Sequence, residues 1–280
     1  MFGTSDKPSR EDRALIRVLD RQCDIPALRR LIAAIGPAEE AAAELTETAI
    51  GLDSSVFLRL ASHAKSADII DYFSGRHSAP LILPGQAVQE FWNNQLQAVD
   101  TISSSLRKKF DAFRAEFEGI DPGFGEYSGK VVSLLDEFSA EHGHVYEEGT
   151  VRETGRLLDT LQRTAIVPFV SRAQFDPFAQ QRKRTKTPPG FKDDGDGDFF
   201  IWADMLRGLQ LARKRRLHFS KVVLVTEDKK KDWSRAGLPH PMLAAEIAAL
   251  FNAPFQIWNL ARLANEVAHV LQTSPNDAVD

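Results

Sequence analysis

The sequence predicts an α/β protein built on a parallel β-sheet of four or five strands. Short apolar runs typical of buried strands are separated by longer helix-forming stretches. The convincing runs are AIGLD at residues 49–53, LIL at 81–83 and VVLVT at 222–226. Two further candidates are TAIVPFV at 164–170 and APFQIW at 253–258. Strands that alternate with helices in this way favour a parallel sheet.

The composition is that of an ordinary globular protein. The 280 residues suffice for one large or two small domains. The net charge of −4 does not by itself indicate a nucleic-acid binder, although local patches matter more than the sum. Cys23, the only cysteine, excludes an internal disulfide and a zinc site made of thiolates. Because the sequence has no secretory signal and no apolar run of about 18 residues, we expect a cytoplasmic protein without a membrane segment.

Residues 1–47 are expected to form a helical N-terminal extension. SREDRALIRVLDR, residues 9–21, begins with a capping box, because Ser9 is followed three residues later by Asp12. AEEAAAELTE, residues 38–47, is rich in alanine and glutamate, which form helices readily. Nothing in this extension suggests catalysis.

The later helices and loops are predicted in order. Pro84 stands where proline favours the start of a helix. Residues 96–165 are charged and mostly helical, and QQRKRTKTPPG at 180–190 is expected to be a basic loop closed by prolines. A helix at about 199–216 then leads into the strand at 222–226.

Four acidic residues are expected at the carboxyl edge of the sheet. Asp53 ends the first strand, and Asp228 follows the strand at 222–226. Glu90 lies about two turns into its helix, and Asp198 lies at the start of the helix that precedes Asp228. Ligands bind beyond the carboxyl ends of such strands, so the four acids could meet there. Carboxylate oxygens are the ligands that Mg²⁺ and Mn²⁺ prefer, and paired ions can activate water for phosphodiester hydrolysis.

Each acid also has a plainer interpretation. Asp198 or Asp53 could cap the helix that follows it, because aspartate is a favoured N-cap residue. Asp228 could be a turn residue, and Glu90 could be a solvated helix residue. Any one of these acids alone is weak evidence, and their joint placement is what favours a metal site.

Other metal and phosphate motifs are disfavoured. DDGDGDF, residues 193–199, resembles the start of a calcium loop, but Phe199 and Met205 stand where that loop needs glycine and glutamate. Asp53 lacks a second aspartate two residues later, which disfavours a phosphatase of the haloacid dehalogenase type. No GxxxxGK[ST] segment is present, so the P-loop is absent.

Basic runs lie beside the acidic segments. RKRTK at 182–186 precedes the acidic loop, and KKK at 229–231 follows Asp228. Positive charge is needed there if a phosphate backbone is to be neutralised, whereas RKRR at 213–216 could simply complement a helix C-terminus. We therefore expect a nucleic-acid groove. The residues expected to contact nucleic acid are Arg182, Lys183, Arg184, Lys186, Lys192, Lys229 and Lys231.

Four segments together resemble a PIN-like domain of the PIN and flap-endonuclease-like nuclease superfamily. They are GLDSSVFLRL, PGQAVQEFWNN, PPGFKDDGDGDFFIWADML and VVLVTEDKKKDW, and they match the branch with PGFKD…GD…IW and TxDxKxDW motifs. The resemblance spans about residues 48–272. It implies a three-layer α/β/α sandwich with a central parallel sheet and a metal-dependent nuclease site of three or four acids.

The resemblance also implies roles for individual acids. Carried over motif by motif, the catalytic and metal-binding residues are Asp53, Glu90, Asp198 and Asp228. Asp193 and Asp232 match further positions of the branch and could be outer ligands of the metal. Many relatives cut RNA, often as toxins or defence components, and others resemble flap endonucleases that cut DNA.

We therefore expect an endonuclease that depends on Mg²⁺ or Mn²⁺ and hydrolyses RNA rather than DNA. Alternatives are a non-catalytic PIN-like module that binds nucleic acid or a partner protein, a DNA structure-specific nuclease, and a different phosphotransfer fold. The nuclease domain is expected at residues 48–272, with a flexible tail at 273–280. A helical insertion at about 100–185, longer than in minimal PIN domains, could bind a partner protein or a second copy of the chain.

Overall fold

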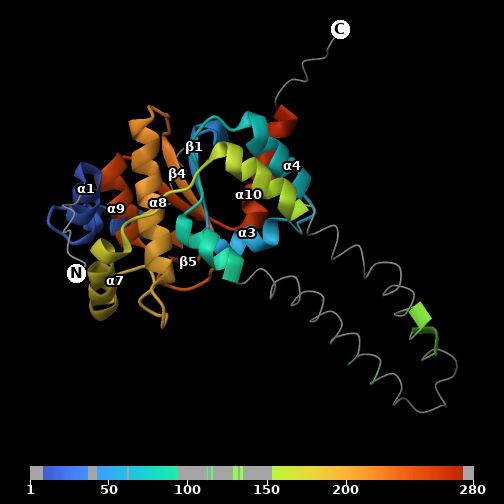
Figure 1. The fold of residues 1–280 in the computed structure, drawn as a ribbon, viewed down its shortest axis with the longest axis horizontal. Coiled ribbons are helices and arrows are strands. Elements are labelled where there is room, and N and C mark those ends of the chain that lie inside the picture. The colour runs from blue at the N-terminus through green and yellow to red at the C-terminus, as the bar shows by residue number, and fades with distance from the viewer. Residues whose placement is uncertain are drawn as a thin grey trace, which may run out of the picture.

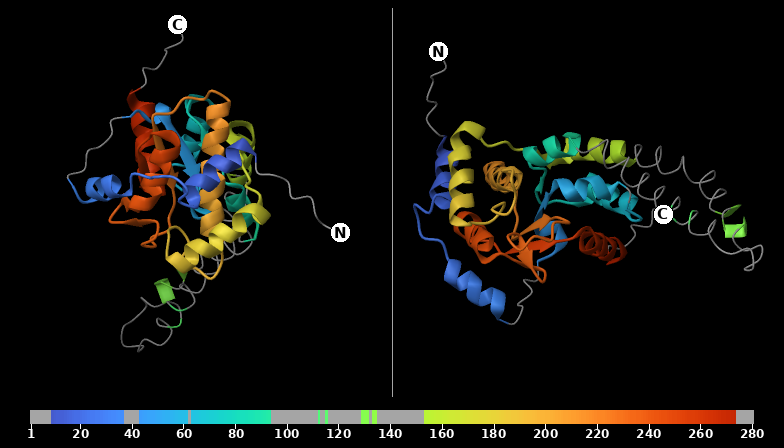
Figure 2. Two further views of the ribbon diagram at one scale, coloured as in Figure 1. Left: turned by 90° about the vertical axis from the view of Figure 1, so that its left-hand side faces the viewer. Right: turned by 90° about the horizontal axis from the view of Figure 1, so that it is seen from below.

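A five-stranded parallel sheet forms the centre of the computed structural model (Figure 1). The structure describes residues 9–36, 43–61, 63–93 and 153–273, together with isolated residues between 112 and 134. Helices cover both faces of the sheet, as the view from below in Figure 2 shows. The predicted three-layer α/β/α sandwich with a central parallel sheet is confirmed.

The sheet contains every strand that the sequence predicts. The strands are β1 (Thr48–Leu52), β2 (Leu81–Ile82), β3 (Ala165–Ile166), β4 (Lys221–Val225) and β7 (Phe255–Trp258). Their order in the sheet is β3-β2-β1-β4-β7, and every pairing is parallel. All residues of β1 and β4 are buried, and after its first residue each strand is a continuous apolar run rather than an alternating one, as expected for strands covered on both faces.

The strand order places a topological switch point between β1 and β4. The chain continues from β1 to β2 and β3 on one side, whereas β4 and β7 lie on the other side. Such a switch point opens a crevice at the carboxyl ends of the two strands. Leu52 is in register with Val225, and the amide of Asp53 donates to the carbonyl oxygen of Val225 at 3.0 Å. Asp53 and Thr226 therefore leave the sheet side by side.

The helices pack around this sheet. They are α1 (Arg10–Leu19), α2 (Ala27–Ile35), α3 (Ser54–Leu60), α4 (Ser66–Asp71), α7 (Arg172–Thr185), α8 (Gly197–Lys214), α9 (Pro241–Phe251) and α10 (Leu260–Thr273). Residues 85–93 and 153–164 are also helical, and the first of these helices begins directly after Pro84, as predicted. The short strands β5 (Ser234–Arg235) and β6 (Leu238–Pro239) form an antiparallel hairpin. Helix α8 packs against β2 and β3, and α10 packs against α4.

The N-terminal helices lie against the α/β core. The capping box of α1 is confirmed, because Ser9 Oγ accepts from the amide of Asp12 at 3.0 Å and Asp12 Oδ2 accepts from the amide of Ser9 at 3.2 Å. Helix α1 packs against α8 and α9. Residues 45–47 form a 3₁₀ turn rather than an α-helix, and residues 38–42 lie outside the described chain.

Two expectations about the middle of the chain need correction. Of the loop predicted at 180–190, residues 180–185 belong to the end of α7, and the helix ends at Lys186 in the left-handed conformation with φ of 52°. The predicted insertion at 100–185 contains β3 and α7, so its last part belongs to the core of the fold. Most of residues 94–152, and all but the first residue of the expected tail at 273–280, lie outside the described chain. Among the described helices, none is both long and apolar enough to cross a bilayer.

Candidate active site

Asp53 lies at the carboxyl end of β1, where neutral donors hold both of its oxygens. Oδ1 accepts from the amide of Ser54 at 2.8 Å. Oδ2 accepts from Ser55 Oγ at 2.6 Å and from Thr226 Oγ1 at 2.6 Å. Asp53 is thus the N-cap of α3, the plainer role considered for it. The hydrogen bond from Ser54 uses one lone pair of Oδ1, so this oxygen can still accept a hydrogen bond or bind a cation.

Glu90 reaches the same edge from the helix at 85–93. Its Oε2 accepts from Ser54 Oγ at 2.7 Å, and its Oε1 accepts from Gln86 Nε2 at 3.1 Å. A Cβ built on Gly197 would lie 2.4 Å from Glu90 Oε1. The carboxylate of Glu90 therefore lies against the first residue of α8, next to Asp198.

A buried acid that the sequence interpretation missed fixes the helix of Glu90. Asp204, on α8, accepts from the amide of Gln86 at 2.9 Å and from the amide of Val170 at 2.8 Å. Arg172 adds an ion pair with Asp204 at 3.1 Å. Burial raises the pKa of Asp204, although the hydrogen bonds oppose this effect. The available signal was an aspartate inside the apolar run FFIWADML.

Asp198 lies in the first turn of α8, but it is not the N-cap, a position that Asp196 takes. Its Oδ2 accepts from Trp233 Nε1 at 3.1 Å and from Lys230 Nζ at 3.2 Å. Burial, together with the nearby carboxylate of Asp193, raises the pKa of Asp198 to about 7. The capping alternative for Asp198 is therefore wrong, and the residue lies in a crowded acidic environment.

Lys230 is the second functional candidate that the sequence interpretation missed. Its Nζ lies 2.5 Å from Asp193 Oδ2, 3.2 Å from Asp198 Oδ2 and 2.9 Å from Asp228 Oδ2. Burial would lower the pKa of Lys230, but the hydrogen bonds that it donates to these carboxylates hold the pKa above its usual value. The signal was present, since Lys230 is the lysine of the TxDxKxDW motif.

Asp228 connects the two halves of the site. Its amide donates to Thr226 Oγ1 at 2.9 Å, and Thr226 in turn donates to Asp53. Its Oδ1 accepts from the amide of Lys230 at 2.7 Å. The structure thus brings all four predicted catalytic acids, and Asp193, to one edge. We call Asp53, Glu90, Asp193, Asp198 and Asp228 the acid cluster.

Asp232 supports this cluster from below. It is fully buried, and its Oδ2 accepts from the amide of Gly190 at 3.0 Å. Gly190 has φ of 82°, and a Cβ there would lie 3.0 Å from Asp198 Cβ. Asp232 therefore stabilises the turn at Gly190, against which Asp198 packs. Its role as an outer ligand of a metal stays a prediction.

The basic residues divide into buried and exposed groups. The expectation that Arg182 contacts nucleic acid is wrong, because Arg182 is only 3% exposed and its Nη1 bonds Glu246 Oε1 at 2.9 Å. Glu246 also accepts from Trp202 Nε1 at 2.6 Å. Lys183 is half-buried and bonds Asp196 at 2.9 Å. The exposed members are Arg184, Lys186, Lys192, Lys229 and Lys231.

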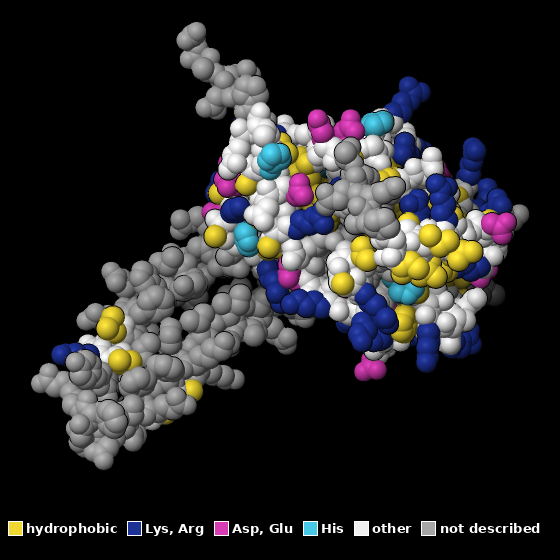
Figure 3. All heavy atoms as spheres, turned by 180° about the vertical axis from the view of Figure 1, so that it is seen from behind, with side chains coloured by type: hydrophobic (Ala, Val, Ile, Leu, Met, Phe, Trp, Pro, Cys, Tyr) yellow, Lys and Arg dark blue, Asp and Glu magenta, His cyan; other side chains and the backbone are white. Residues whose placement is uncertain are grey.

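Positive charge is distributed widely over the surface. On the face of the molecule shown in Figure 3, lysine and arginine side chains lie in several separate groups. On this face the basic residues form no single continuous surface, so we expect contact with a phosphate backbone to depend on those that lie near the acid cluster.

The acid cluster offers only carboxylate oxygens, and these are the ligands that hard divalent cations such as Mg²⁺ and Mn²⁺ prefer. An ammonium already lies among three of these carboxylates, which shows that this place favours positive charge. Across the described ranges, no group of three acidic, histidine or cysteine side chains is arranged to hold a metal ion as it stands. Direct coordination by several acids would therefore require some of these side chains to turn.

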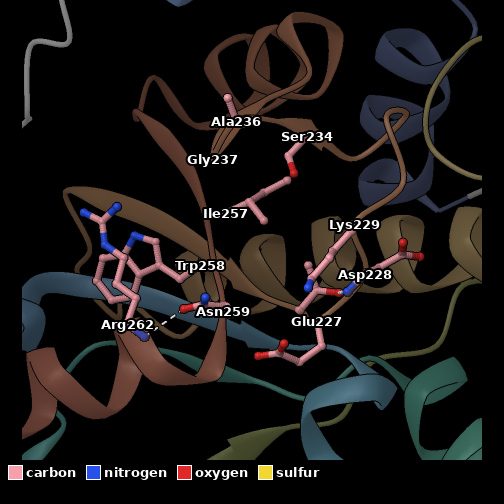
Figure 4. A pocket seen from close by; sticks show the side chains of 11 residues that line it. Glu227, Asp228, Lys229, Ser234, Ala236, Gly237, Ile257, Trp258, Asn259 and Arg262 are labelled. Carbon is pink, nitrogen blue, oxygen red and sulfur yellow. Dashed lines mark hydrogen bonds between the residues drawn. The ribbon is translucent and has the colours of Figure 1, made fainter.

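A cavity of about 470 Å³ adjoins Asp228. Figure 4 shows Glu227, Asp228 and Lys229 on one side of it and Trp258 and Arg262 on the other. This size is within the range of small-molecule sites, so part of a ligand could lie next to Asp228.

The fold and the acid cluster define a class of protein: a parallel α/β domain with an acidic site at its topological switch point. Residues 171–239 match the family model of the PIN like domain. The predicted resemblance to a PIN-like domain is confirmed, over a shorter range than the expected 48–272. The matched residues include Asp193, Asp198, Asp228 and Lys230. Comparisons with curated proteins and with solved structures give no match.

Proposed function

We propose that this protein is an endonuclease that depends on Mg²⁺ or Mn²⁺ and hydrolyses phosphodiester bonds of RNA. The observation that carries the proposal is the meeting of Asp53, Glu90, Asp198 and Asp228 at the switch point. The PIN-like match supports it, because PIN-like domains are generally nucleases. The choice of RNA rests on the resemblance to PIN domains, many of which cut RNA.

The chain's own residues prepare the site for this reaction. Asp53, Glu90, Asp198 and Asp228 would hold a divalent ion, which would supply an activated water and neutralise the leaving oxygen. Hydrogen bonds from Ser54 and Gln86 orient the carboxylate of Glu90, which could accept a proton from the attacking water. The N-terminus of α8 adds a favourable dipole for negative charge near Asp198.

The exposed basic residues would bind the substrate backbone. Lys192 precedes Asp193, and Lys229 and Lys231 follow Asp228, so each lies within a few residues of the acid cluster. Phosphate binding by these side chains would release counterions and make affinity depend on salt.

A cleavage assay tests the proposal. Purified full-length protein is incubated with labelled single-stranded RNA, single-stranded DNA and duplex DNA, with Mn²⁺, Mg²⁺ or EDTA. Cleavage of RNA that requires Mn²⁺ or Mg²⁺, stops with EDTA and is lost in Asp53→Asn supports the proposal. Cleavage in excess EDTA contradicts the metal mechanism, and cleavage of DNA alone contradicts the choice of RNA.

A second candidate is a non-catalytic module that binds nucleic acid through the same groove. The specific observation in its favour is the ammonium of Lys230, which occupies a place among three acids. Binding of RNA without cleavage under any metal condition supports this candidate over the nuclease.

A further inference from the structure

We propose that Lys230 is a resident cation of the acid cluster, in the position that a second divalent ion would otherwise take. The site would then bind one divalent ion, with Asp53 and Glu90 as its main ligands and with Asp198 and Asp228 offering the lone pairs that Lys230 does not use. This inference deepens the proposed function and rests on it for the identity of that ion.

The contacts of Lys230 match a cation position. Its Nζ bonds three carboxylates: Asp193 at 2.5 Å just before α8, Asp198 at 3.2 Å in the first turn of α8, and Asp228 at 2.9 Å after β4. An ammonium has three N–H donors, so each donor has one carboxylate and none remains for a substrate phosphate. The lysine thus neutralises this half of the cluster from within.

The local backbone holds Lys230 in this place. Its amide donates to Asp228 Oδ1 at 2.7 Å, and its carbonyl accepts from the amide of Trp233 at 3.1 Å. Trp233 Nε1 in turn donates to Asp198 at 3.1 Å. Because the ammonium is tethered, it has a high effective concentration at the three acids, and a free ion must compete with it.

The neighbouring lysines provide an internal contrast. Lys229 and Lys231 carry the same charge in the same run, but both are exposed. A basic run that served only to attract phosphate would not need one of its members inside the cluster. The middle lysine therefore has a different role from its neighbours.

Among the described residues, no lysine or arginine is seen to bond the other half of the cluster, Asp53 and Glu90. In the part of the chain that the structure describes, the hydrogen-bond donors to Asp53 and Glu90 are the neutral groups of Ser54, Ser55, Thr226 and Gln86. Negative charge on these two acids is therefore oriented but not neutralised. A divalent ion gains most by binding on this side.

Counting bound Mn²⁺ tests the inference without any assay of activity. Electron paramagnetic resonance of free Mn²⁺ gives the number of ions bound by full-length wild type and by Lys230→Met. We expect at most one ion in the wild type and one more in the variant. Lys229→Met and Lys231→Met remove the same charge from exposed positions, and Lys230→Arg keeps the charge in place. These three controls should bind as many ions as the wild type.

Equal numbers of ions in Lys230→Met and the wild type would overturn the inference. Two bound ions in the wild type would also overturn the inference, and this result does not depend on whether Lys230→Met folds. Melting curves show whether Lys230→Met is folded. Asp53→Asn separates this test from the proposed function. Loss of the wild-type ion in Asp53→Asn supports the metal site regardless of Lys230. If Lys230→Met binds one more ion than the wild type but Asp53→Asn keeps the wild-type ion, the role of Lys230 is supported and the metal site at Asp53 is contradicted.

Discussion

Glu90 and Gly197 lie in direct contact although more than 100 positions separate them in the sequence. A Cβ on Gly197 would lie 2.4 Å from Glu90 Oε1, closer than side-chain atoms approach one another in folded proteins. The absence of a side chain at Gly197 thus gives the carboxylate of Glu90 its place beside Asp198.

The substitution Gly197→Ala should displace Glu90 and leave the fold intact. The obstructing atom is the end of a flexible side chain, so the added methyl can be accommodated if the carboxylate moves. A displacement of about 1 Å at a reacting group can lower the rate about 100-fold. We therefore expect a loss of RNA cleavage of about this size, with a melting temperature close to that of the wild type.

Gly195→Ala is the matched control for this prediction. A Cβ at Gly195 would meet only the amide of Gly197, at 4.0 Å, which is an ordinary contact. Gly195→Ala should keep wild-type cleavage. Equal activity of the two variants would show that the position of Glu90 does not matter for the reaction.

Asp198→Asn should weaken metal binding without lowering the stability of the metal-free protein. In the metal-free protein at pH 8, burial and the nearby Asp193 make the ionised form of Asp198 unfavourable, since its pKa is raised to about 7. Asparagine carries no charge, so the metal-free variant should be as stable as the wild type or more stable. Its cleavage should be lost, and Mn²⁺ should raise its melting temperature less, because a weaker affinity stabilises less at the same ion concentration. An unchanged Mn²⁺ response would remove Asp198 from the ligands.

The sequence was sufficient to predict the sheet. The runs that became β1 and β4 are buried on both faces, and such continuous apolar runs are the pattern of a parallel sheet. Alternation of strands with helices then brought Asp53 and Asp228 to one edge. The basic residues of 182–185 were mistaken for a loop because the two prolines that follow dominated the interpretation. The helix in fact runs to Thr185, shortly before those prolines.

The site could be predicted only in part, because sequence patterns do not show which side chain meets which. A run of three lysines after Asp228 predicts a basic surface, but nothing in the run indicates that Lys230 turns inward. Arg182 was indistinguishable in sequence from Arg184, yet only Arg182 is buried. Its partner Glu246 lies 64 residues later, and pairing at such separation depends on the tertiary fold.

Arg182→Met should destabilise the protein. Arg182 bonds the fully buried Glu246 at 2.9 Å and the carbonyl of Pro188. Removing one partner of a buried pair leaves the other charge without compensation, at a cost of about 3 kcal/mol. Arg21, 2.7 Å from Glu246, keeps the loss from being larger. Chemical denaturation should show this loss, and Arg184→Met on the exposed face of the same helix should lose much less. Equal stability of the two variants would contradict the structural role of Arg182.

The exposed basic residues should determine how RNA binding depends on salt. Replacing Arg184, Lys186 and Lys192 with alanine removes three charges that could contact phosphates. The slope of log K against log salt should become shallower by about 0.7 for each lost contact with single-stranded RNA. Fluorescence anisotropy at several salt concentrations measures this slope. Arg13→Ala with Arg29→Ala, exposed on the N-terminal helices, is the control. A slope that changes by the same amount per removed charge in both variants would mean that binding follows net charge rather than this surface.

Outside the site, His77 should make stability depend on pH. Burial lowers the pKa of His77 to about 4, and its Nδ1 lies 3.1 Å from the hydroxyl of the buried Tyr72. Between about pH 4 and 6.5, His77 is protonated in the unfolded chain but neutral in the folded chain, so stability rises with pH across this window. Acidification from pH 6.5 to 4 should therefore cost on the order of 3 kcal/mol from this residue.

Chemical denaturation at pH 7, 5.5 and 4.5 measures this effect when the wild type is compared with His77→Gln. The variant should be less stable at pH 7, because a glutamine side chain does not reproduce the ring packing of His77 against Phe73. Its free energy of unfolding should nevertheless fall less steeply toward pH 4.5, because glutamine does not titrate. His63→Gln makes the same replacement at another histidine and is the control. Parallel curves for the wild type and His77→Gln would show that other groups cause the acid sensitivity.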